Sequence, residues 1–325
     1  MVSVIVPVYQ GERMILGAVR SVLNQTHEDL ELLVVDDGST DRTLEILSTI
    51  VDSRLVVLRQ KNSGTGAARN LALARARGRY IAFLDSDDRW FPDKLAAEIR
   101  VLQSAPAPVA IAYSSYYAVD DRGRLLNPAP KRNHAGEALE LLLDGEDFLM
   151  PSVCLFDRRV FDTLGHFKAE RYHEDHEYIL RASRSYPIYP TGERLVVYRQ
   201  STNGKCRSLL ADFGQAREAE VAVLEDLRSS LTPDQSARLR QNALRSLYCR
   251  FLMYGFNGHA RRMQGEIDLG RLRIGKKGWL AWFFAKTGIN LLIGARLSIQ
   301  SFYLHARQGA WNRRLVTSHL ELRYD

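Results

Sequence analysis

The sequence predicts an α/β fold in which a mostly parallel sheet is flanked by helices and followed by a helical C-terminal extension. Over roughly the first 120 residues, short apolar runs alternate with helical patterns, which is the rhythm of βαβ units. Two of those runs end directly in acidic clusters, as the ligand-binding strands of open α/β sheets do. Beyond Leu209 the strand patterns fade and helical spacing dominates.

Four apolar runs mark the expected strands of the first part, and the patterns between them mark helices. The expected strands are Ser3–Val8, Leu30–Val35, Leu55–Leu58 and Tyr80–Leu84. The expected helices are Met14–Gln25, a segment capped by Asp41, Gly66–Arg77, and a segment to about Gln103 with Pro92 in its first turn. This alternation predicts a mostly parallel sheet with helices on both faces.

The alternation is looser after this part. The runs PAPVAIAYSSYYAV and MPSVCLF are strand candidates, separated by a polar, proline-containing loop over Asn127–Asn133. Glu174–Arg184 has the pattern of a helix, and Arg194–Tyr198 is the last expected strand.

Charge divides the chain near Cys206. Residues 206–325 carry 19 Lys and Arg against 10 Asp and Glu, whereas residues 1–205 carry 26 against 28. We therefore expect an α/β domain over residues 1–206, with halves of about 1–105 and 106–206, and a basic helical extension over residues 207–325. A basic extension suggests an anionic partner, either lipid or nucleic acid.

Cysteine usage and the N-terminal residues indicate the compartment. Cys154, Cys206 and Cys249 show no paired spacing, which argues against a disulfide framework or a zinc site and favours a reducing compartment. The chain begins with MVSVIVPV, without a basic region or a cleavage site, so we expect no signal peptide. The expected location is the cytoplasm, with peripheral attachment to the cytoplasmic face of the inner membrane as one option.

The DSDD sequence after the run YIAFL carries the strongest chemical information. Asp85 and Asp87 form a D-x-D at the end of a predicted buried strand. Hard oxygen ligands of this kind suit Mg²⁺ or Mn²⁺ held jointly with substrate phosphates. An acidic turn is the alternative. Three acids in four positions would repel one another, which favours a cation site.

Two other polar segments follow the predicted strands. Asp36 and Asp37 end a strand, where one of them could accept a hydrogen bond from a base or ribose, although this segment taken alone favours a surface turn. The Gly-rich segment 62–70 could offer backbone N–H groups and Arg69 to a diphosphate. It matches neither the Rossmann fingerprint nor the Walker A loop.

Glu174 and Asp175 open a predicted helix. A carboxylate in this position is often only a partner of the helix dipole. His173 and His176 flank the pair, but no cysteine or third histidine is near in sequence, so a structural zinc site is not expected.

Taken in order, these segments resemble the motifs of family 2 glycosyltransferases, which have the GT-A fold. The matching text is VSVIVPVYQ, AVRSVLNQTHEDLELLVVDDGSTDRT, NSGTGAARNLALARARGRYIAFLDSDDRWFPDKL and LGHFKAERYHEDHEYILRAS, followed by VVYRQ. The resemblance covers about Met1 to Arg207. It implies a Rossmann-like GT-A domain that moves a sugar from a nucleotide-sugar, by the habit of the family a UDP-sugar, with inversion at the anomeric carbon.

The resemblance also implies roles for residues by position. Nucleotide-sugar binding falls to Pro7, Tyr9, Glu12, Asp36, Asp37, Asn62, Arg69, Asp85 and Ser86, with Asp36 or Asp37 on the base. Metal binding falls to Asp87, the more direct ligand, and Asp85, with Mg²⁺ or Mn²⁺ as the cofactor. Asp175 corresponds to the catalytic base, with Glu174 beside it.

Two departures from the family pattern narrow the expectation. Many relatives have a histidine two residues after the Tyr-Arg pair that corresponds to Tyr198 and Arg199, and here that residue is Ser201. Lys205 or Arg207 is therefore expected to serve the phosphates. The chain also has no Q-x-x-R-W sequence, which favours single-sugar addition over the processive synthase type.

Residues 276–314 are apolar and basic together. Trp279, Trp282 and Phe283 lie in a run that Lys286 and Arg296 interrupt, so no uncharged stretch reaches the ~20 residues needed to span a bilayer. A basic helix rich in aromatic residues fits an in-plane membrane helix on an anionic leaflet. Packing on the catalytic domain or in a homodimer interface is the alternative.

Three other functions are alternatives to glycosyl transfer. A nucleotidyltransferase would show a Gly-rich, basic first turn, whereas this chain has PVYQGERM. A catalytically silent nucleotide-sugar-binding or scaffold protein stays open because of Ser201, although Asp85, Asp87 and Asp175 are retained. Nucleic-acid binding is not expected, because the basic residues of the extension alternate with apolar ones. The expected partners are a nucleotide-sugar and a glycan or lipid-linked glycan acceptor for cell-surface polysaccharide.

Overall fold

The computed structural model describes most of the first 263 residues. The described residues are 1–105, 110–128, 133–144, 148–168, 174–201, 210–218, 227, 231–253 and 256–263. Contacts divide the chain into two compact units, Met1–Leu269 and Gly270–Asp325. The second unit, and with it the predicted membrane helix of residues 276–314, lies outside the described residues. The predicted domain boundary near Cys206 also lies among the residues that are not described, so it stays a prediction.

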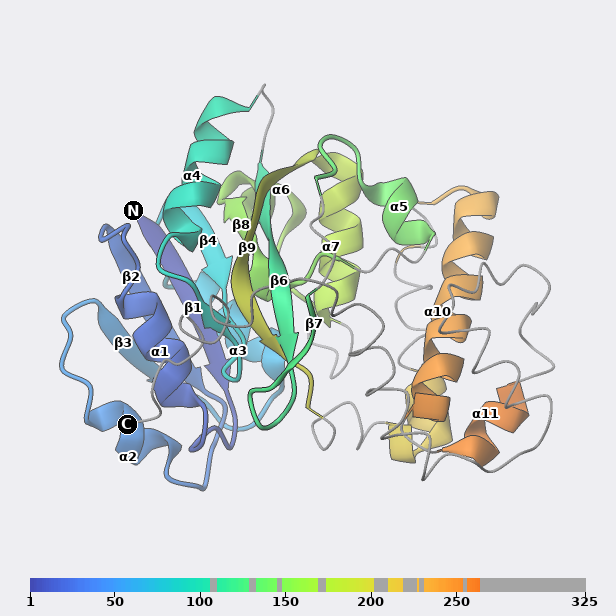
Figure 1. The fold of residues 1–325 in the computed structure, drawn as a ribbon, viewed down its shortest axis with the longest axis horizontal. Coiled ribbons are helices and arrows are strands. Elements are labelled where there is room, and N and C mark those ends of the chain that lie inside the picture. Colours follow the sequence, from blue (N-terminus) through green and yellow to red (C-terminus); the bar gives the residue numbers. More distant parts are fainter. Residues whose placement is uncertain are drawn as a thin grey trace, which may run out of the picture. The chain divides into compact units, whose positions relative to one another are not determined.

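The described residues form one nine-stranded sheet (Figure 1). Its strands are β1 (Val2–Val8), β2 (Leu30–Asp36), β3 (Leu55–Arg59), β4 (Tyr80–Phe83), β5 (Arg89–Trp90), β6 (Ile111–Val119), β7 (Leu125–Pro128), β8 (Cys154–Asp157) and β9 (Ile188–Arg199). The order is β3-β2-β1-β4-β8-β6-β9-β5, and β7 pairs with β6. Strands β5, β7 and β8 run antiparallel to their neighbours, so the other six share one direction. The predicted mostly parallel α/β fold is confirmed.

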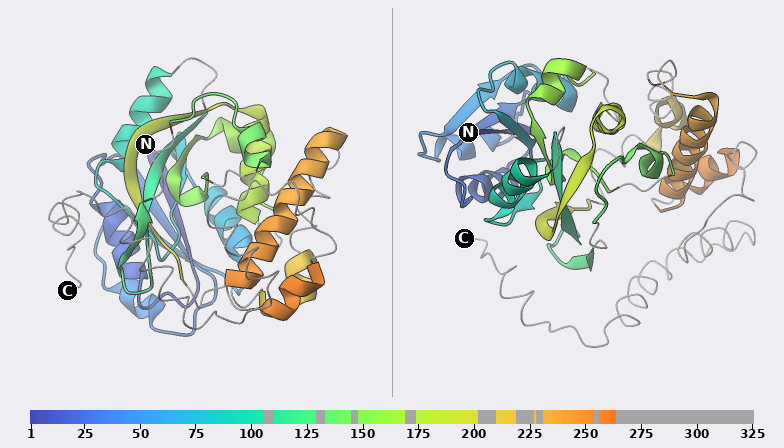
Figure 2. Two further views of the ribbon diagram at one scale, coloured as in Figure 1. Left: turned by 45° about the vertical axis from the view of Figure 1, so that its right-hand side comes forward. Right: turned by 90° about the horizontal axis from the view of Figure 1, so that it is seen from above.

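Helices cover both faces of this sheet. They are α1 (Ile15–Leu23), α2 (Thr43–Ser48), α3 (Thr65–Leu73), α4 (Lys94–Ser104), α5 (Leu139–Leu143), α6 (Arg159–Leu164), α7 (Glu174–Ser185), α10 (Pro233–Met253) and α11 (Asn257–Met263), with a short 3₁₀ helix at Pro151–Val153. Helices α1 and α4 lie on one face, and α3 and α6 lie on the other (Figures 1 and 2). None of the helices seen in the described ranges is long and apolar enough to cross a membrane.

The central strands explain why the sequence folds this way. Every residue of β1 and β2 is buried, as expected for parallel strands covered on both faces. Two polar residues of these strands bond to each other: the Ser3 hydroxyl donates to a Glu31 carboxylate oxygen at 2.6 Å. Glu31 also accepts a hydrogen bond from the Arg77 N–H at 2.6 Å. Helix α3 ends at Leu73 rather than at the predicted Arg77, and the residues that follow it continue in turns, in which the Ala76 N–H donates to the Ala72 carbonyl at 2.8 Å.

Other elements differ from the prediction in their limits. Helix α4 begins at Lys94, two residues after Pro92, and the Pro92 carbonyl instead accepts a hydrogen bond from the Thr26 N–H. The residue at the N-terminal cap of α2 is Arg42, while Asp41 Oδ1 accepts the Thr43 N–H at 3.0 Å. The segment expected to be a polar loop over residues 127–133 begins with the end of β7.

Helix α10 is attached to the α/β part through α5. Arg238 forms ion pairs with Glu140 (2.5 Å) and Asp144 (2.6 Å), both in or next to α5. These are partly exposed pairs, which contribute little stability individually. The elements after β9 in the described residues are the helices α10 and α11, and α10 belongs to the same compact unit as the sheet.

Candidate active site

The candidate site lies where the parallel strands β1, β2 and β4 end. Val8 lies opposite Asp36 in the β1–β2 pair, and Ile5 lies opposite Phe83 in the β1–β4 pair. The chain therefore leaves these strands side by side, and the two acidic clusters that begin at Asp36 and Asp85 follow directly. This carboxyl edge is where open α/β sheets bind ligands.

The carboxylate of Asp37 holds the Gly-rich loop. Its Oδ1 accepts a hydrogen bond from the Ser63 N–H (2.8 Å), and its Oδ2 accepts one from the Gly64 N–H (2.9 Å). The two loops approach closely at Gly38, which has φ of +81° and where a Cβ would lie 2.8 Å from the backbone nitrogen of Asn62. Asp37 therefore shapes the loop that presents the exposed Asn62.

Asp36 has a different environment. It is fully buried, and its Oδ1 accepts a hydrogen bond from the Ser39 N–H at 3.1 Å. Its Oδ2 lies 3.3 Å from Nε of Arg59 and has no hydrogen-bond partner within the part of the chain that the structure describes. Buried acceptors are normally satisfied, so this oxygen is suited to a donor group of a ligand. Pro7 is buried in β1 opposite Val35.

The loop after β1 is fixed to the loop after β2. Gln10 has a left-handed backbone with φ of 54°, and its Oε1 accepts hydrogen bonds from the N–H groups of Thr40 (3.0 Å) and Asp41 (3.1 Å). The Glu12 N–H donates to Asp41 Oδ2 at 3.0 Å. Such a strained residue persists only where its surroundings hold it. Here the hydrogen bonds of Gln10 fix this loop, and the preceding residue, Tyr9, has 51% of its surface exposed.

Arg69 in α3 joins two acidic clusters. Its side chain is only 2% exposed; Nη2 donates to Asp85 Oδ1 at 2.8 Å and Nη1 to Glu174 Oε1 at 3.4 Å. The rings of Phe83 and Phe167 face the guanidinium, with centroids 5.9 and 5.3 Å from Cζ. Burial opposes its charge, but the surrounding carboxylates hold the pKa of Arg69 above its usual value.

Two distant elements hold the D-x-D loop from behind. The Asp85 N–H donates to Ser152 Oγ at 3.1 Å. Arg199, at the end of β9, donates its N–H to Asp88 Oδ1 at 2.9 Å and its Nε–H to the Asp87 carbonyl at 3.3 Å. Asp88 is buried, and this burial together with the charges of Asp87 and Asp85 raises its pKa well above the usual value.

The ionisation of Asp87 bears on metal binding. Burial, followed by the charge of Asp85, raises the pKa of Asp87 to about 6. A cation next to this carboxylate would remove that penalty. No cluster of three or more His, Cys, Asp or Glu side chains that could hold a metal occurs in the described ranges. Two carboxylates completed by phosphate oxygens nevertheless form a ligand set that fits Mg²⁺ or Mn²⁺. Ser86 lies half-buried between them.

Glu174 and Asp175 begin α7 and differ in burial. Glu174 is buried against Arg69, whereas Asp175 is half-buried and its Oδ1 accepts a hydrogen bond from the His176 N–H at 2.8 Å. The pair thus presents one internal and one more accessible carboxylate beside the D-x-D loop.

Some predicted residues lie outside this description, and some neighbours were not predicted. Lys205 and Arg207 fall among the residues that the structure does not describe. Ser152 was not foreseen, because it lies in a stretch whose only sequence feature was a strand candidate. Arg199 was noted only as part of a Tyr-Arg pair, although its bonds to the D-x-D loop make it part of the site.

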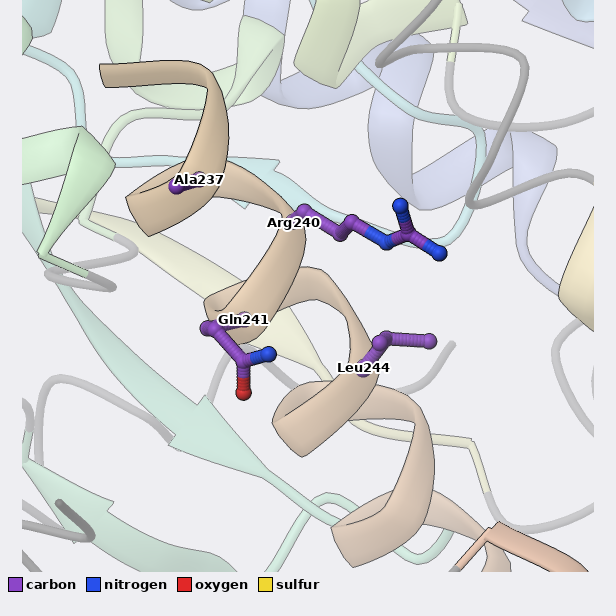
Figure 3. A pocket seen from close by; sticks show the side chains of 4 residues that line it. All are labelled: Ala237, Arg240, Gln241 and Leu244. Atoms are coloured by element: carbon purple, nitrogen blue, oxygen red, sulfur yellow. The ribbon is translucent and has the colours of Figure 1, made fainter. Parts of the chain in front are cut away.

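A separate hollow lies on α10. Its volume is about 320 Å³, and the side chains around it are those of Ala237, Arg240, Gln241 and Leu244 (Figure 3). These four come from a single helix and include no carboxylate, so they offer neither a base nor a ligand for a hard cation.

A comparison with solved structures defines the class of fold. The structure of S. aureus TarS residues 1–349 in complex with UDP-GlcNAc matches with a TM-score of 0.58 and 23% identity, over 79% of this chain and 74% of that chain. The chain thus has the GT-A fold, a sheet flanked by helices with the D-x-D loop at its carboxyl edge.

The sequence comparisons define the family. The profile described as "Glycosyl transferase family 2" matches residues 3–165, half of the chain, and the chain belongs to this family. A Bacillus subtilis relative named "Putative teichuronic acid biosynthesis glycosyltransferase TuaG" is 42% identical over 142 residues, 43% of this chain and 54% of its own length.

A second relative has a more specific name. The Escherichia coli protein "UDP-Glc:alpha-D-GlcNAc-diphosphoundecaprenol beta-1,3-glucosyltransferase WfaP" is 40% identical over 122 residues, 37% of this chain and 48% of its own length. The chain therefore spans about half the length of these two relatives.

Proposed function

We propose that this chain transfers single sugars from a nucleotide-sugar to a hydroxyl group of a glycan or lipid-linked glycan acceptor, with inversion at the anomeric carbon. The observation that carries the proposal is the network at the sheet edge, in which Arg69 contacts both Asp85 and Glu174. This network joins a group of acids suited to a leaving diphosphate to a second group suited to a base.

UDP is the proposed nucleotide. In support, the E. coli relative is named for UDP-Glc, and the TarS structure was solved with UDP-GlcNAc. The donor would lie over the ends of β1 and β2, against Tyr9 and Asn62. The base would reach Asp36, whose buried Oδ2 forms an ion pair with Arg59 at 3.3 Å but has no hydrogen-bond partner among the described residues. Glu12 would lie in the same loop after β1, which the hydrogen bond from its N–H to Asp41 holds in place.

Asp175 is the proposed base. It would take the proton from the acceptor hydroxyl as the oxygen attacks C1 of the sugar from the face opposite the diphosphate. A direct displacement inverts the configuration and forms no covalent enzyme intermediate. Asp175 suits this role better than Glu174 because it is the less buried of the two and Glu174 contacts Arg69.

A divalent cation held by Asp87 and Asp85 would neutralise charge on the departing nucleoside diphosphate. The chain's own contribution is to hold these carboxylates in place through Ser152 and Arg199. Lys205 and Arg207 are proposed as further phosphate partners on sequence alone.

The acceptor is proposed to be lipid-linked and to belong to cell-surface polysaccharide synthesis. Support comes from the names of the two relatives, one of which specifies a diphosphoundecaprenol acceptor. A basic, aromatic segment at residues 276–314 would bring the enzyme to the cytoplasmic surface of the membrane that carries such an acceptor.

Calorimetric titration tests the donor site first. UDP, GDP and dTDP are titrated into the full chain with Mn²⁺ and again with EDTA, and transfer is then measured with the matching nucleotide-sugars and a polyprenyl-diphosphate sugar. We expect metal-dependent binding of UDP and release of UDP during transfer. Binding without transfer to any acceptor would favour a silent nucleotide-sugar-binding protein, and failure of a folded chain to bind any nucleotide would contradict the proposal.

A further inference from the structure

A diphosphate-binding loop and helix would present their polar groups to a ligand. In this chain, polar groups of the Gly-rich loop and of α3 are instead bonded to other residues of the protein. The Arg69 guanidinium is the clearest case, because it is 2% exposed and bonded to Asp85 and Glu174. Arginines that bind phosphates present their N–H groups to the ligand. Both terminal nitrogens of the Arg69 guanidinium already donate to carboxylates, and the rings of Phe83 and Phe167 lie against it.

The same helix also contacts the chain on both sides of residues 169–173, which are not among the described residues. On one side, Asn70 Nδ2 donates to the Phe167 carbonyl at 2.8 Å, and the Phe167 N–H donates to Asn70 Oδ1 at 3.0 Å. A Cβ on Gly66 would lie 2.6 Å from the Lys168 carbonyl oxygen and 3.2 Å from Cγ of Glu174, so α3 touches the start of α7 directly.

We propose that Arg69 is a positioning residue that couples the leaving-group side of the site to its base side. It fixes Asp85 at one end and Glu174, next to Asp175, at the other, while Asn70 anchors the residues that lead into α7. The inference rests on the proposed function, since it assigns Asp85 and Asp175 to the two halves of one reaction.

Arginine suits this role for two reasons. Its planar fork reaches two carboxylates in fixed directions, which the point charge of a lysine cannot do. Its permanent positive charge also favours the ionised form of the acids around it, including the base. A neutral residue at position 69 would misplace Glu174 and would remove the positive charge that now acts on the base, Asp175.

The experiment compares Arg69→Gln and Arg69→Lys with the full-length wild type, with Arg75→Gln as a matched control at an exposed arginine just after α3. UDP affinity is measured by calorimetry and kcat and KM from pH 5 to 9. For Arg69→Gln we expect kcat to fall at least tenfold, the UDP dissociation constant to change less than threefold, and the acid limb of the kcat profile to move to higher pH. Arg69→Lys should restore the acid limb, because it restores the charge, but only part of kcat, because it lacks the fork.

Glu174→Gln should shift the acid limb of the kcat profile in the direction opposite to that of Arg69→Gln. It removes a negative neighbour of Asp175, so the acid limb should move to lower pH. A purely structural role for the two residues would not shift the limb in opposite directions. Asn70→Ala tests the proposal where Arg69→Gln fails to fold, because it should lower kcat without weakening UDP binding.

The outcomes separate this inference from the function on which it rests. A wild type without transfer activity overturns the proposed function. An active wild type whose Arg69→Gln variant loses UDP affinity tenfold or more, with kcat nearly unchanged, shows that Arg69 binds the diphosphate and overturns the positioning role. Normal kcat in Asn70→Ala overturns the anchoring by α3.

Discussion

Asp175 and Glu174 are neighbours in sequence whose environments differ, and substitution separates their roles. We expect Asp175→Asn to lower kcat by about 10²–10⁴-fold, the usual contribution of a positioned base, and to leave UDP affinity unchanged. Steady-state kinetics and calorimetry measure the two quantities. Glu193→Gln, at an exposed carboxylate of β9, serves as the control. Normal turnover by Asp175→Asn would remove this residue from the mechanism.

Asp87, the proposed metal ligand, would make metal binding depend on pH. Its pKa is raised to about 6, so it binds a proton in the folded state at pH values where the unfolded chain has already lost it. The charge of Asp87 therefore opposes folding as the pH rises from about 4 to 6 and above. A protonated carboxyl is also a poor metal ligand.

We accordingly expect Mn²⁺-dependent UDP binding to weaken as the pH falls through about 6. Asp87→Asn should lose that binding at pH 8 yet melt at the same temperature as the wild type or higher, because it removes a penalised charge. Calorimetry and thermal denaturation at pH 8 test both parts. A clear drop in melting temperature with binding intact would show that Asp87 is a structural acid.

The sequence identified the acids of the site more readily than the residues that hold them. Asp85 and Asp87 follow a recognisable buried strand, and the carboxyl ends of parallel strands meet at one edge, so their grouping with Asp36 could be foreseen. Ser152 bonds across 67 positions and Arg199 across 111. No local pattern encodes such distant pairs, since they depend on how β8 and β9 enter the sheet.

At the scale of elements, α4 contains a buried ion pair that its sequence would place on the surface. Lys94 and Glu98 have the i, i+4 spacing of a surface pair, but both side chains are fully buried, 2.6 Å apart, against the ring of Trp90. Glu98 also accepts the Ser114 hydroxyl at 2.7 Å, and burial raises its pKa to about 6.

Removing one partner of this pair should be costly. We expect Glu98→Ala to lower the free energy of unfolding by about 3–5 kcal/mol, because it leaves the Lys94 charge buried alone. The double substitution Lys94→Met, Glu98→Leu should recover most of that loss. Urea denaturation at pH 7.5 provides the measurement. A loss below about 1 kcal/mol in the single variant would mean that water reaches Lys94.

The limits of predictability at this scale have physical causes. Strands β1, β2 and β4 are apolar runs with bounded ends, and they were predicted almost residue for residue. Strand β5 has only two residues and exists because β9 pairs with it. The first half of β9 contains Pro190 and Gly192, which predict a break, and irregular register near Ser115 of β6 accommodates them.

At the scale of the whole molecule, the two compact units suggest separable roles. We expect the full chain to float with anionic liposomes and to be released by high salt, because charge attraction is screened. A chain ending at Leu269 should stay in the soluble fraction while it binds UDP as before. Neutral liposomes are the control. Equal partitioning of both forms would show that residues 270–325 do not bind membranes.

The hydrogen bond between Arg199 and Asp88 also limits how early the D-x-D loop can fold during synthesis. Because the D-x-D loop is held by a residue 111 positions later, it cannot take its final form on the ribosome until β9 has been made. At ordinary synthesis rates of about 5–20 residues per second, that delay is roughly 6–22 s. During this time the D-x-D loop lacks its hydrogen bonds to Arg199, so the proposed donor site would be completed only after β9 has been made.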